Sequence, residues 1–260
     1  MNFAQHHTTL DAGMEALQAE MSHADETLVR DIQEKFLISW LYHDNALDGV
    51  VLTYHELKAA IDERIISDSS LIPMYDSIRA QKKAIDIVKQ QASKRRAGIT
   101  MEFIKKLHRT LTVDDDPLYQ QYRKENPLHR LYFHEIVPPE KISYRLRKLV
   151  DWTKSDDFKK SHPLNKAAQL HLNFITIYPW LKNSGKVARL LMNFILMRHG
   201  YVPAVIHAVH RQRYYEVLRS ASYQDLANLI AESLNNAIES TLKYASESSL
   251  DQPSSDMPAR

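Results

Sequence analysis

Two consecutive apolar segments, residues 163–178 and 185–199, constrain the fold of this chain more than any other part of its sequence. In the first segment, apolar residues recur every three or four positions, which predicts a helix with one buried stripe. The second segment is apolar on nearly every side, and a helix without a polar face must lie in the middle of a protein. We therefore expect an α-helical protein that is built around this pair of helices.

The turn between the two segments, residues 179–184, carries the unusual chemistry. It leads into a helix N-terminus, where the first backbone N–H groups have no partner within the helix. Lys182, Lys186 and Arg189 lie in the turn or shortly after it. Because unpaired N–H groups and nearby cations form a natural anion site, we expect a phosphate or a carboxylate here.

Composition favours a soluble helical protein. Only 5 glycines and 10 prolines occur in 260 residues, which argues against a turn-rich β fold. The 34 basic and 32 acidic residues nearly cancel, so net charge gives no argument for a nucleic-acid or membrane partner. The lack of cysteine fits a reducing compartment, and neither a signal peptide nor a membrane-spanning run is found. We expect a cytoplasmic protein, and the sequence leaves its oligomeric state open.

Helical periodicity and capping residues predict the other elements. The predicted helices cover about residues 8–21, 26–43, 53–66, 73–94, 99–111, 139–152, 211–218 and 225–244. Residues 44–53 are predicted to form a turn-like connector, and residues 112–137 are the least helical part of the chain. The polar end of the chain has little to bury and is expected to be disordered.

The residues from Tyr178 to Arg189 resemble the signature of the Fic family, His-Pro-Phe-x-(Asp/Glu)-Gly-Asn-Gly-Arg-x-x-Arg between two helices. This chain reads Tyr-Pro-Trp-Leu-Lys-Asn-Ser-Gly-Lys-Val-Ala-Arg. It keeps the proline, an aromatic residue, one glycine and two cations. Tyr178 replaces the histidine that is catalytic in the family, and Lys182 replaces the acid that binds the metal.

The resemblance implies an all-α, Fic-like helical domain with a small β-hairpin flap and an N-terminal helical extension. The implied organisation is an N-terminal helical region over residues 1–98, a Fic-like core over 99–220, a C-terminal helix over 221–246 and a disordered tail over 247–260. The flap candidates are Tyr122 and Arg123, with an alternating pattern at Leu131, Phe133 and Ile136. In the family, the flap holds a protein target by strand addition, so it is also the expected site of a protein partner.

The resemblance further implies a nucleotide site at the turn. The candidate residues for binding an anion or a nucleotide are Lys182, Asn183, Ser184, Gly185, Lys186 and Arg189. A pattern that forms the wall behind the nucleotide in the family matches Arg211, Tyr214 and Tyr215, although any helix with one aromatic face would give it. The expected ligand is ATP, another nucleotide or another phosphorylated small molecule. No strong magnesium site is expected, because a lysine cannot hold a cation.

A second motif lies at the end of the predicted helix over residues 26–43. Fic proteins with an N-terminal inhibitory helix show (Ser/Thr)-x-x-x-Glu-(Gly/Asn), often followed by Leu-Thr, and Asp44, Asp48 and Gly49 stand at the three defined positions. In that subfamily the glutamate pairs with the second arginine of the signature and blocks the γ-phosphate of ATP. The equivalent pair here is Asp48 with Arg189. Alternatively, both aspartates only cap or solvate a turn.

The sequence gives no convincing metal site. Three adjacent aspartates, residues 114–116, do not match the spacing of a calcium loop and are better explained as a solvated turn. His207 and His210 are three residues apart, but spacing nominates no third ligand. His171 lies on an apolar stripe and is expected to be a hydrogen-bonded core histidine.

Transfer of AMP to a protein hydroxyl requires a base with a pKa near neutral, which histidine has and tyrosine, with a pKa near 10, lacks. The favoured hypothesis is a pseudoenzyme that binds a nucleotide, another phosphorylated ligand or a protein partner. The alternative is a transferase with altered chemistry that uses the retained cations, with Tyr178 at a degenerate catalytic position. A scaffold without a ligand is a third hypothesis.

Overall fold

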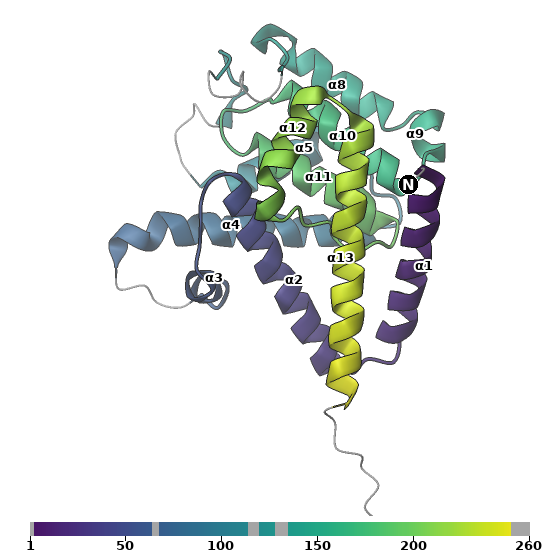
Figure 1. Ribbon diagram of the computed structural model, residues 1–260. Helices are drawn as coiled ribbons and strands as arrows, with labels where there is room; N and C mark the ends of the chain where they lie inside the picture. Colours follow the sequence, from purple (N-terminus) through teal and green to yellow (C-terminus); the bar gives the residue numbers. More distant parts are fainter. Residues whose placement is uncertain (1–2, 64–67, 114–119, 128–134, 251–260) are drawn as a thin grey trace, which may run out of the picture.

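The computed structural model describes residues 3–63, 68–113, 120–127 and 135–250. Within these ranges the chain is helical and contains no strand (Figure 1). Its α-helices are α1 (Phe3–Met21), α2 (Glu26–Leu47), α3 (Tyr54–Ile61), α4 (Ile72–Ser93), α5 (Met101–Leu111), α8 (Ile142–Trp152), α9 (Asp156–Lys160), α10 (Pro163–Ile177), α11 (Ser184–Arg198), α12 (Arg211–Ser220) and α13 (Tyr223–Leu250). Short 3₁₀ turns cover Ser69–Leu71, Pro139–Lys141 and Ala208–His210. The predicted all-α fold is confirmed.

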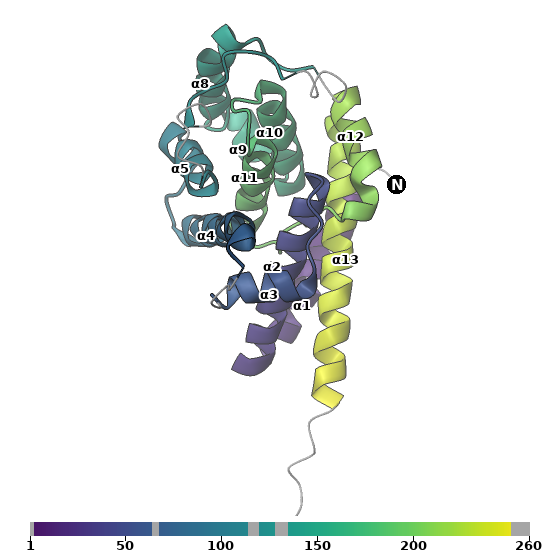
Figure 2. The same cartoon turned by 90° about the vertical axis from the view of Figure 1, so that its left-hand side faces the viewer.

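Helix α11 occupies the centre of the fold. It packs against α10 and, from other sides, against α4 and α5 (Figure 2). Every residue of α11 from Lys186 to Leu196 is buried. Burial of apolar surface is the main favourable term in folding, so the prediction of a central helix from its apolar sequence is confirmed.

Helices α1, α2 and α13 extend beyond the bundle that surrounds α11 (Figures 1 and 2). Helix α13 packs against α1, α10, α12 and α2. The inner stripe of α1 is formed by Leu10, Met14 and Leu17, which are all buried. The arrangement leaves much of the first half of α2 at the surface, whereas its last turn reaches the central helix.

Several predicted boundaries require correction. Helix α2 continues to Leu47, so residues 44–47 are helical and the connector is reduced to residues 48–53. The periodicity of apolar residues does not detect this last turn, because its polar side chains are buried against other polar groups. Helix α13 continues to Leu250, so residues 247–250 are helical and not disordered. The short helix α9, capped by Ser155, was not predicted.

Some predictions fall outside the described residues. These include the aspartate run 114–116, the flap residues Leu131 and Phe133, and the last ten residues of the chain. Of the flap candidates, Tyr122, Arg123 and Ile136 are described; Tyr122 is half-buried, and Arg123 and Ile136 are buried. Among the helices that the structure describes, none combines the length and the apolar character needed to cross a membrane.

Candidate anion-binding site

The turn between α10 and α11, residues 178–183, is called the signature turn below. Two of its residues have left-handed backbone conformations, Tyr178 with φ 45° and Asn183 with φ 65°. This conformation costs an L-residue other than glycine about 1–2 kcal/mol. Contacts from the rest of the fold must therefore hold the turn in place.

Arg123 supplies much of that support. Its side chain is buried, and its Nε donates a hydrogen bond to the carbonyl oxygen of Tyr178 at 2.7 Å. Its Nη2 donates to the carbonyls of Ile177, at 3.2 Å, and of Val137. Its backbone N–H donates to the carbonyl of Pro179 at 3.0 Å. Arg123 therefore anchors the end of α10, and its assignment to a flap stays a prediction.

Two predicted anion ligands also brace the turn. The Ser184 hydroxyl accepts from the backbone N–H of Trp180 at 2.9 Å and donates to the carbonyl of the same residue at 2.8 Å. The side-chain amide of Asn183 donates to the carbonyl of Leu111 at 3.2 Å. The side chains of Asn183 and Ser184 thus bind the chain itself, and their contact with a ligand stays a prediction.

Tyr178, at the position of the family's catalytic histidine, is only 1% exposed. Trp180 is buried beside it, and the ring of Trp180 stacks on His108 of α5 with 3.8 Å between ring centroids and 6° between planes. A phenol with so little accessible surface has no contact with a substrate in solution. In this conformation Tyr178 is therefore a core residue.

His108 was not singled out from the sequence. Burial lowers the pKa of His108 from 6.5 to about 4, and a hydrogen bond with the backbone of Lys182 opposes that fall only in part. The ring is therefore neutral at pH 7. It joins α5 to the signature turn through its contacts with Trp180 and Lys182.

We expect the free energy of unfolding to fall as the pH is lowered. The buried ring of His108 resists protonation, whereas the same ring in the unfolded chain takes up a proton readily. Because the pKa of His108 is lower in the folded state than in the unfolded state, its contribution to the free energy of unfolding is fully present above pH 6.5 and is lost as the pH falls to about 4. The fall of the pKa from 6.5 to about 4 corresponds to a contribution of roughly 3 kcal/mol to the free energy of unfolding. Urea unfolding of the native protein and of His108→Gln, measured between pH 8 and 4, tests this. If the difference in stability between the two proteins does not change with pH, His108 is not the group that titrates.

Two cations in the first half of α11 meet the end of α2. Lys186 and Arg189 are both buried. The Nε of Arg189 donates to Oδ1 of Asp44, and its Nη2 donates to Oδ1 of Asp48 at 3.2 Å and to the Asp44 carbonyl at 3.3 Å. The Nζ of Lys186 donates to Oδ1 of Asn45 at 2.7 Å. The anion that faces these cations is therefore a carboxylate of the chain itself.

Gln81 of α4 completes this network. Its Nε2 donates to the second oxygen of Asp44 at 2.6 Å, and its Oε1 accepts from Asn45 at 2.7 Å. Burial alone would lower the pKa of Arg189, but the carboxylates of Asp44 and Asp48 outweigh it and hold that pKa well above its usual value. Burial raises the pKa of Asp44, and the attraction of Arg189 opposes that rise. We call these five residues, Asp44, Asn45, Asp48, Gln81 and Arg189, the clasp.

Asp44 is the deeper partner in the clasp. We expected Asp48 to pair with Arg189, and it does make this contact, but its side chain is 26% exposed whereas that of Asp44 is 4% exposed. Asp44 lies in the last turn of α2, which directs it to the central helix. The alternative that Asp44 only caps or solvates a turn is wrong. Gly49 follows with φ 93°, a conformation that suits glycine.

A side chain at the position of Gly185 would make a tight contact with the clasp. A Cβ atom there would lie 3.2 Å from Nη1 of Arg189 and 3.7 Å from Oδ1 of Asp48. A side chain at residue 185 would push against the clasp. Lys182, the third cation predicted to bind the anion, is exposed on the surface. The structure thus brings Lys186 and Arg189 together with α2 and leaves Lys182 outside.

The residues predicted to form a nucleotide wall hold α2 and the core. The Nε of Arg211 and the hydroxyl of Tyr215 both donate to the carbonyl of Leu47, each at 3.0 Å. This satisfies a carbonyl at the C-terminus of α2 that has no partner within the helix. The Tyr214 hydroxyl lies 2.9 Å from Nε2 of His171, and both residues are buried. His171 is confirmed as a hydrogen-bonded core histidine.

The described residues offer poor ligands for a divalent cation. In these parts of the chain, no group of three or more histidine, aspartate or glutamate side chains is arranged to hold a metal ion. Magnesium prefers carboxylate and water oxygens. At the position of the family's acidic ligand, Lys182 instead offers an ammonium group, which repels a cation. The donor set of the signature turn therefore does not fit Mg²⁺.

Comparison with known proteins gives a consistent answer. Residues 98–196 match the family model described as Fic/DOC family. The chain is 27% identical over 219 residues to the protein adenylyltransferase Fic of Drosophila willistoni, covering 84% of this chain and 43% of that protein. It is 29% identical over 199 residues to the one of Nematostella vectensis, covering 75% and 45%. The chain thus spans less than half the length of these relatives.

Solved structures agree in fold. A Fic domain-containing signaling protein from Bacteroides thetaiotaomicron matches with a TM-score of 0.81 at 25% identity, over 93% of this chain and 98% of that chain. Fic-1 from C. elegans matches with a TM-score of 0.78 at 22% identity, over 96% of this chain and 74% of that chain. At 22% identity, the second match is a likeness of fold alone.

Proposed function

The chain belongs to the Fic family, and we propose that it binds a nucleotide or another phosphorylated ligand at the N-terminus of α11 without transferring AMP. In this proposal the last turn of α2 occupies the place of the ligand's phosphate. The ligand competes with Asp44 and Asp48 for Arg189. The named activity of the relatives, adenylyl transfer, makes an adenine nucleotide the first ligand to test.

The observation that carries the proposal is the buried contact between Asp44 and Arg189. A cation at a helix N-terminus attracts phosphate, and the carboxylate of Asp44 meets the same electrostatic requirement. A site that already holds one anion can hold another when the first is displaced. The partly exposed carboxylate of Asp48 provides a place where the displacement can begin.

The chemistry of two replaced residues supports binding without AMP transfer. Tyr178 stands where the family has its base. Its side chain is buried, and a tyrosine phenol, with an ordinary pKa near 10, already carries its proton at neutral pH and so cannot act as the base. Lys182 stands where the family has its metal-binding acid. Charge on a transferred phosphate is normally neutralised by Mg²⁺, for which Lys182 is no ligand.

A labelling experiment tests this proposal. We expect that the native protein, incubated with Mg²⁺, a protein extract and ATP labelled on its α-phosphate, gives no labelled protein band. A labelled band that depends on the native protein would overturn the proposal.

A thermal-shift experiment tests binding at Arg189. Asp44→Ala should show a thermal shift with ATP that Asp44→Ala combined with Arg189→Ala lacks. Equal shifts for the two variants would contradict binding at Arg189.

The second candidate function is a transferase with altered chemistry. It is favoured by one observation, that Lys182 is exposed in the signature turn, where its ammonium group offers a positive charge at the position of the family's metal-binding acid. Labels on the α- and γ-phosphates of ATP and GTP distinguish the two candidates. Incorporation of any label by Asp44→Ala would favour transfer. Tyr178→His combined with Lys182→Asp and Asp44→Ala then tests whether the inherited reaction can be restored.

A further inference from the structure

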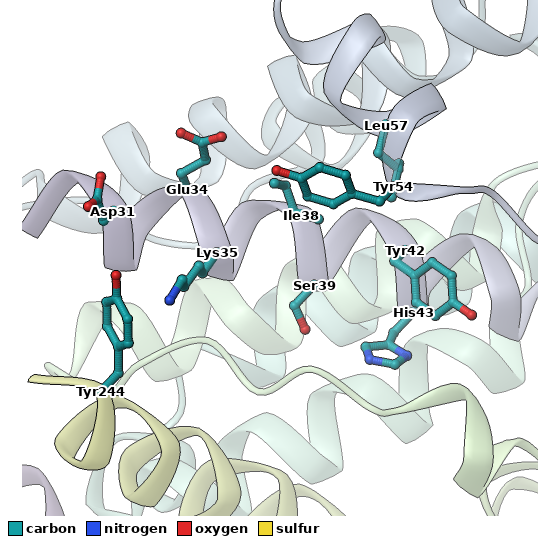
Figure 3. Close-up of a pocket in the computed structure, with 10 residues that line it drawn as sticks. All are labelled: Asp31, Glu34, Lys35, Ile38, Ser39, Tyr42, His43, Tyr54, Leu57 and Tyr244. Carbon is teal, nitrogen blue, oxygen red and sulfur yellow. The ribbon is translucent and has the colours of Figure 1, made fainter. Parts of the chain in front are cut away.

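A cavity of about 550 Å³ lies between α2, the start of α3 and the last turns of α13 (Figure 3). It does not include any residue of the signature turn or of the clasp. Figure 3 shows Asp31 and Tyr244 at one end and Tyr42 and His43 at the other, with Tyr54 between them. The proposed nucleotide function gives this cavity no role.

Aromatic rings from three helices line the cavity. Tyr42 comes from α2, Tyr54 from α3 and Tyr244 from α13. Ile38 and Leu57 add an apolar surface among the rings. The faces of tyrosine rings attract organic cations, and several rings around one cavity are a common means of binding ammonium groups. Such a cavity suits a ligand that is apolar along its length and positively charged at one end.

An ammonium group of the chain already uses one of these rings. The Nζ of Lys35 lies 3.0 Å from the centroid of the Tyr244 ring. Lys35 is an exposed residue of α2, so its side chain is free to leave the ring for solvent. The contact identifies the face of Tyr244 as a place where an ammonium group is stable.

The remaining charges also favour a cation. Asp31 and Glu34 line the same end of the cavity as Tyr244, and Lys58 offsets only the second of these carboxylates. Burial, and to a lesser extent His207, lowers the pKa of His43 to about 4, so this ring adds no positive charge at pH 7. Once Lys35 moves away, a bound cation meets aromatic faces and a carboxylate, whereas an anion meets repulsion.

We propose that this cavity binds a small organic amine, whose ammonium group replaces that of Lys35 on the ring of Tyr244 and whose apolar part lies along α2 towards Ile38. The ligand is an arylalkylamine or a similar molecule with one charged end. An amine of this kind gains the aromatic contact that Lys35 makes and also buries apolar surface, which the ammonium group of Lys35 does not.

Binding at this cavity has a consequence for the clasp, which rests on the proposed function. The cavity is lined by residues of α2 between Asp31 and His43, and Asp44 is the next residue of that helix. A ligand that holds α2 against α3 and α13 stabilises the position in which Asp44 contacts Arg189. The amine and the nucleotide should therefore weaken each other's binding by the same factor.

Direct binding measurements test the site with phenethylamine as the probe. By calorimetry or by NMR titration of the tyrosine rings, we expect phenethylamine to bind more tightly than the neutral 2-phenylethanol, and phenylacetate not to bind. Equal binding of the amine and the alcohol would overturn the role of the ammonium group. Failure of the amine to bind would overturn the proposal whatever the outcome with ATP.

Two substitutions sharpen the test. Lys35→Met removes the competing ammonium group and should tighten binding of phenethylamine by about fivefold, whereas Tyr244→Leu should weaken it by a similar factor. Lys106→Met, at an exposed position of α5, is the control for loss of one positive charge. Unchanged or weaker binding by Lys35→Met would overturn the proposal. Because Lys35 is exposed, this variant decides the question even if Tyr244→Leu fails to fold.

Discussion

Replacement of Asp44 by alanine should lower the free energy of unfolding by about 3–5 kcal/mol, the usual cost of removing one partner of a buried ion pair. The substitution leaves the guanidinium of Arg189 buried with only the more exposed Asp48 as an acidic partner. It also removes the acceptor of the Gln81 amide. Chemical unfolding followed by circular dichroism measures the loss.

The same substitution should make the protein responsive to anions. A phosphate or sulfate ion that fills the space beside Arg189 and Lys186 restores the missing charge, so Asp44→Ala should be stabilised by added phosphate much more than the native protein. Asp48→Ala is the matched control, because its carboxylate is partly exposed and should contribute about 1 kcal/mol or less. An equal loss in both variants, or no response to phosphate, would contradict the role given to Asp44.

The two expected effects of Asp44→Ala have one origin. The carboxylates of the clasp stabilise the fold by pairing with a cation that a phosphorylated ligand also needs. Without a ligand, the site in which the clasp is formed is therefore more stable than the site in which it is open. Ligand binding must exceed the free energy of the clasp before the site opens. A weak ligand therefore leaves the native protein unchanged and still binds Asp44→Ala.

The central features of the fold were predictable from local sequence. The apolar character of α11 predicts its central position, and the polar residues Lys186, Arg189 and Asn193 within its apolar stretch imply buried partners. Asn193 finds its partner in the backbone of Ala204, with hydrogen bonds of 3.1 and 2.8 Å. The resemblance to the Fic family nominated the correct region of α2 as the partner of Arg189.

The role of Asp44 was missed because helix periodicity cannot detect a buried aspartate. The apolar stripe of α2 ends before it, so the helix was expected to stop at residue 43. Only Arg189 and Gln81, which are 145 and 37 residues away along the chain, make burial of this carboxylate possible. A contact of this range is not encoded in any local pattern.

His108 was missed although a local signal existed. It lies four residues after Ile104 and three before Leu111, on the same face of α5, and both of these neighbours are buried. A histidine within an apolar stripe is expected to be buried. This pattern could have shown that His108 is buried, but not that Trp180 covers it.

Replacement of Arg123 by alanine should cost about 4 kcal/mol, because several backbone carbonyls lose their donor at once. The affected groups include the carbonyls of Ile177, Tyr178 and Val137, which lie where α10 ends and the chain enters the signature turn. For a chain of this size the melting temperature should fall by roughly 10 °C. Calorimetry measures the fall, and Arg219→Ala, at an exposed position of α12, is the control.

Arg123→Lys should be little more stable than Arg123→Ala. A single ammonium group cannot reach all the carbonyl oxygens to which the planar guanidinium donates hydrogen bonds at the same time. Local opening should accompany the loss. The Tyr178 N–H, which donates to the Phe174 carbonyl at 3.0 Å, should exchange with solvent faster in both variants. Because Tyr178 holds a strained left-handed conformation, the turn has reason to relax once Arg123 is gone. If the exchange rate of this amide does not change, Ser184 and Asn183 alone hold the turn, and the anion site of α11 does not depend on Arg123.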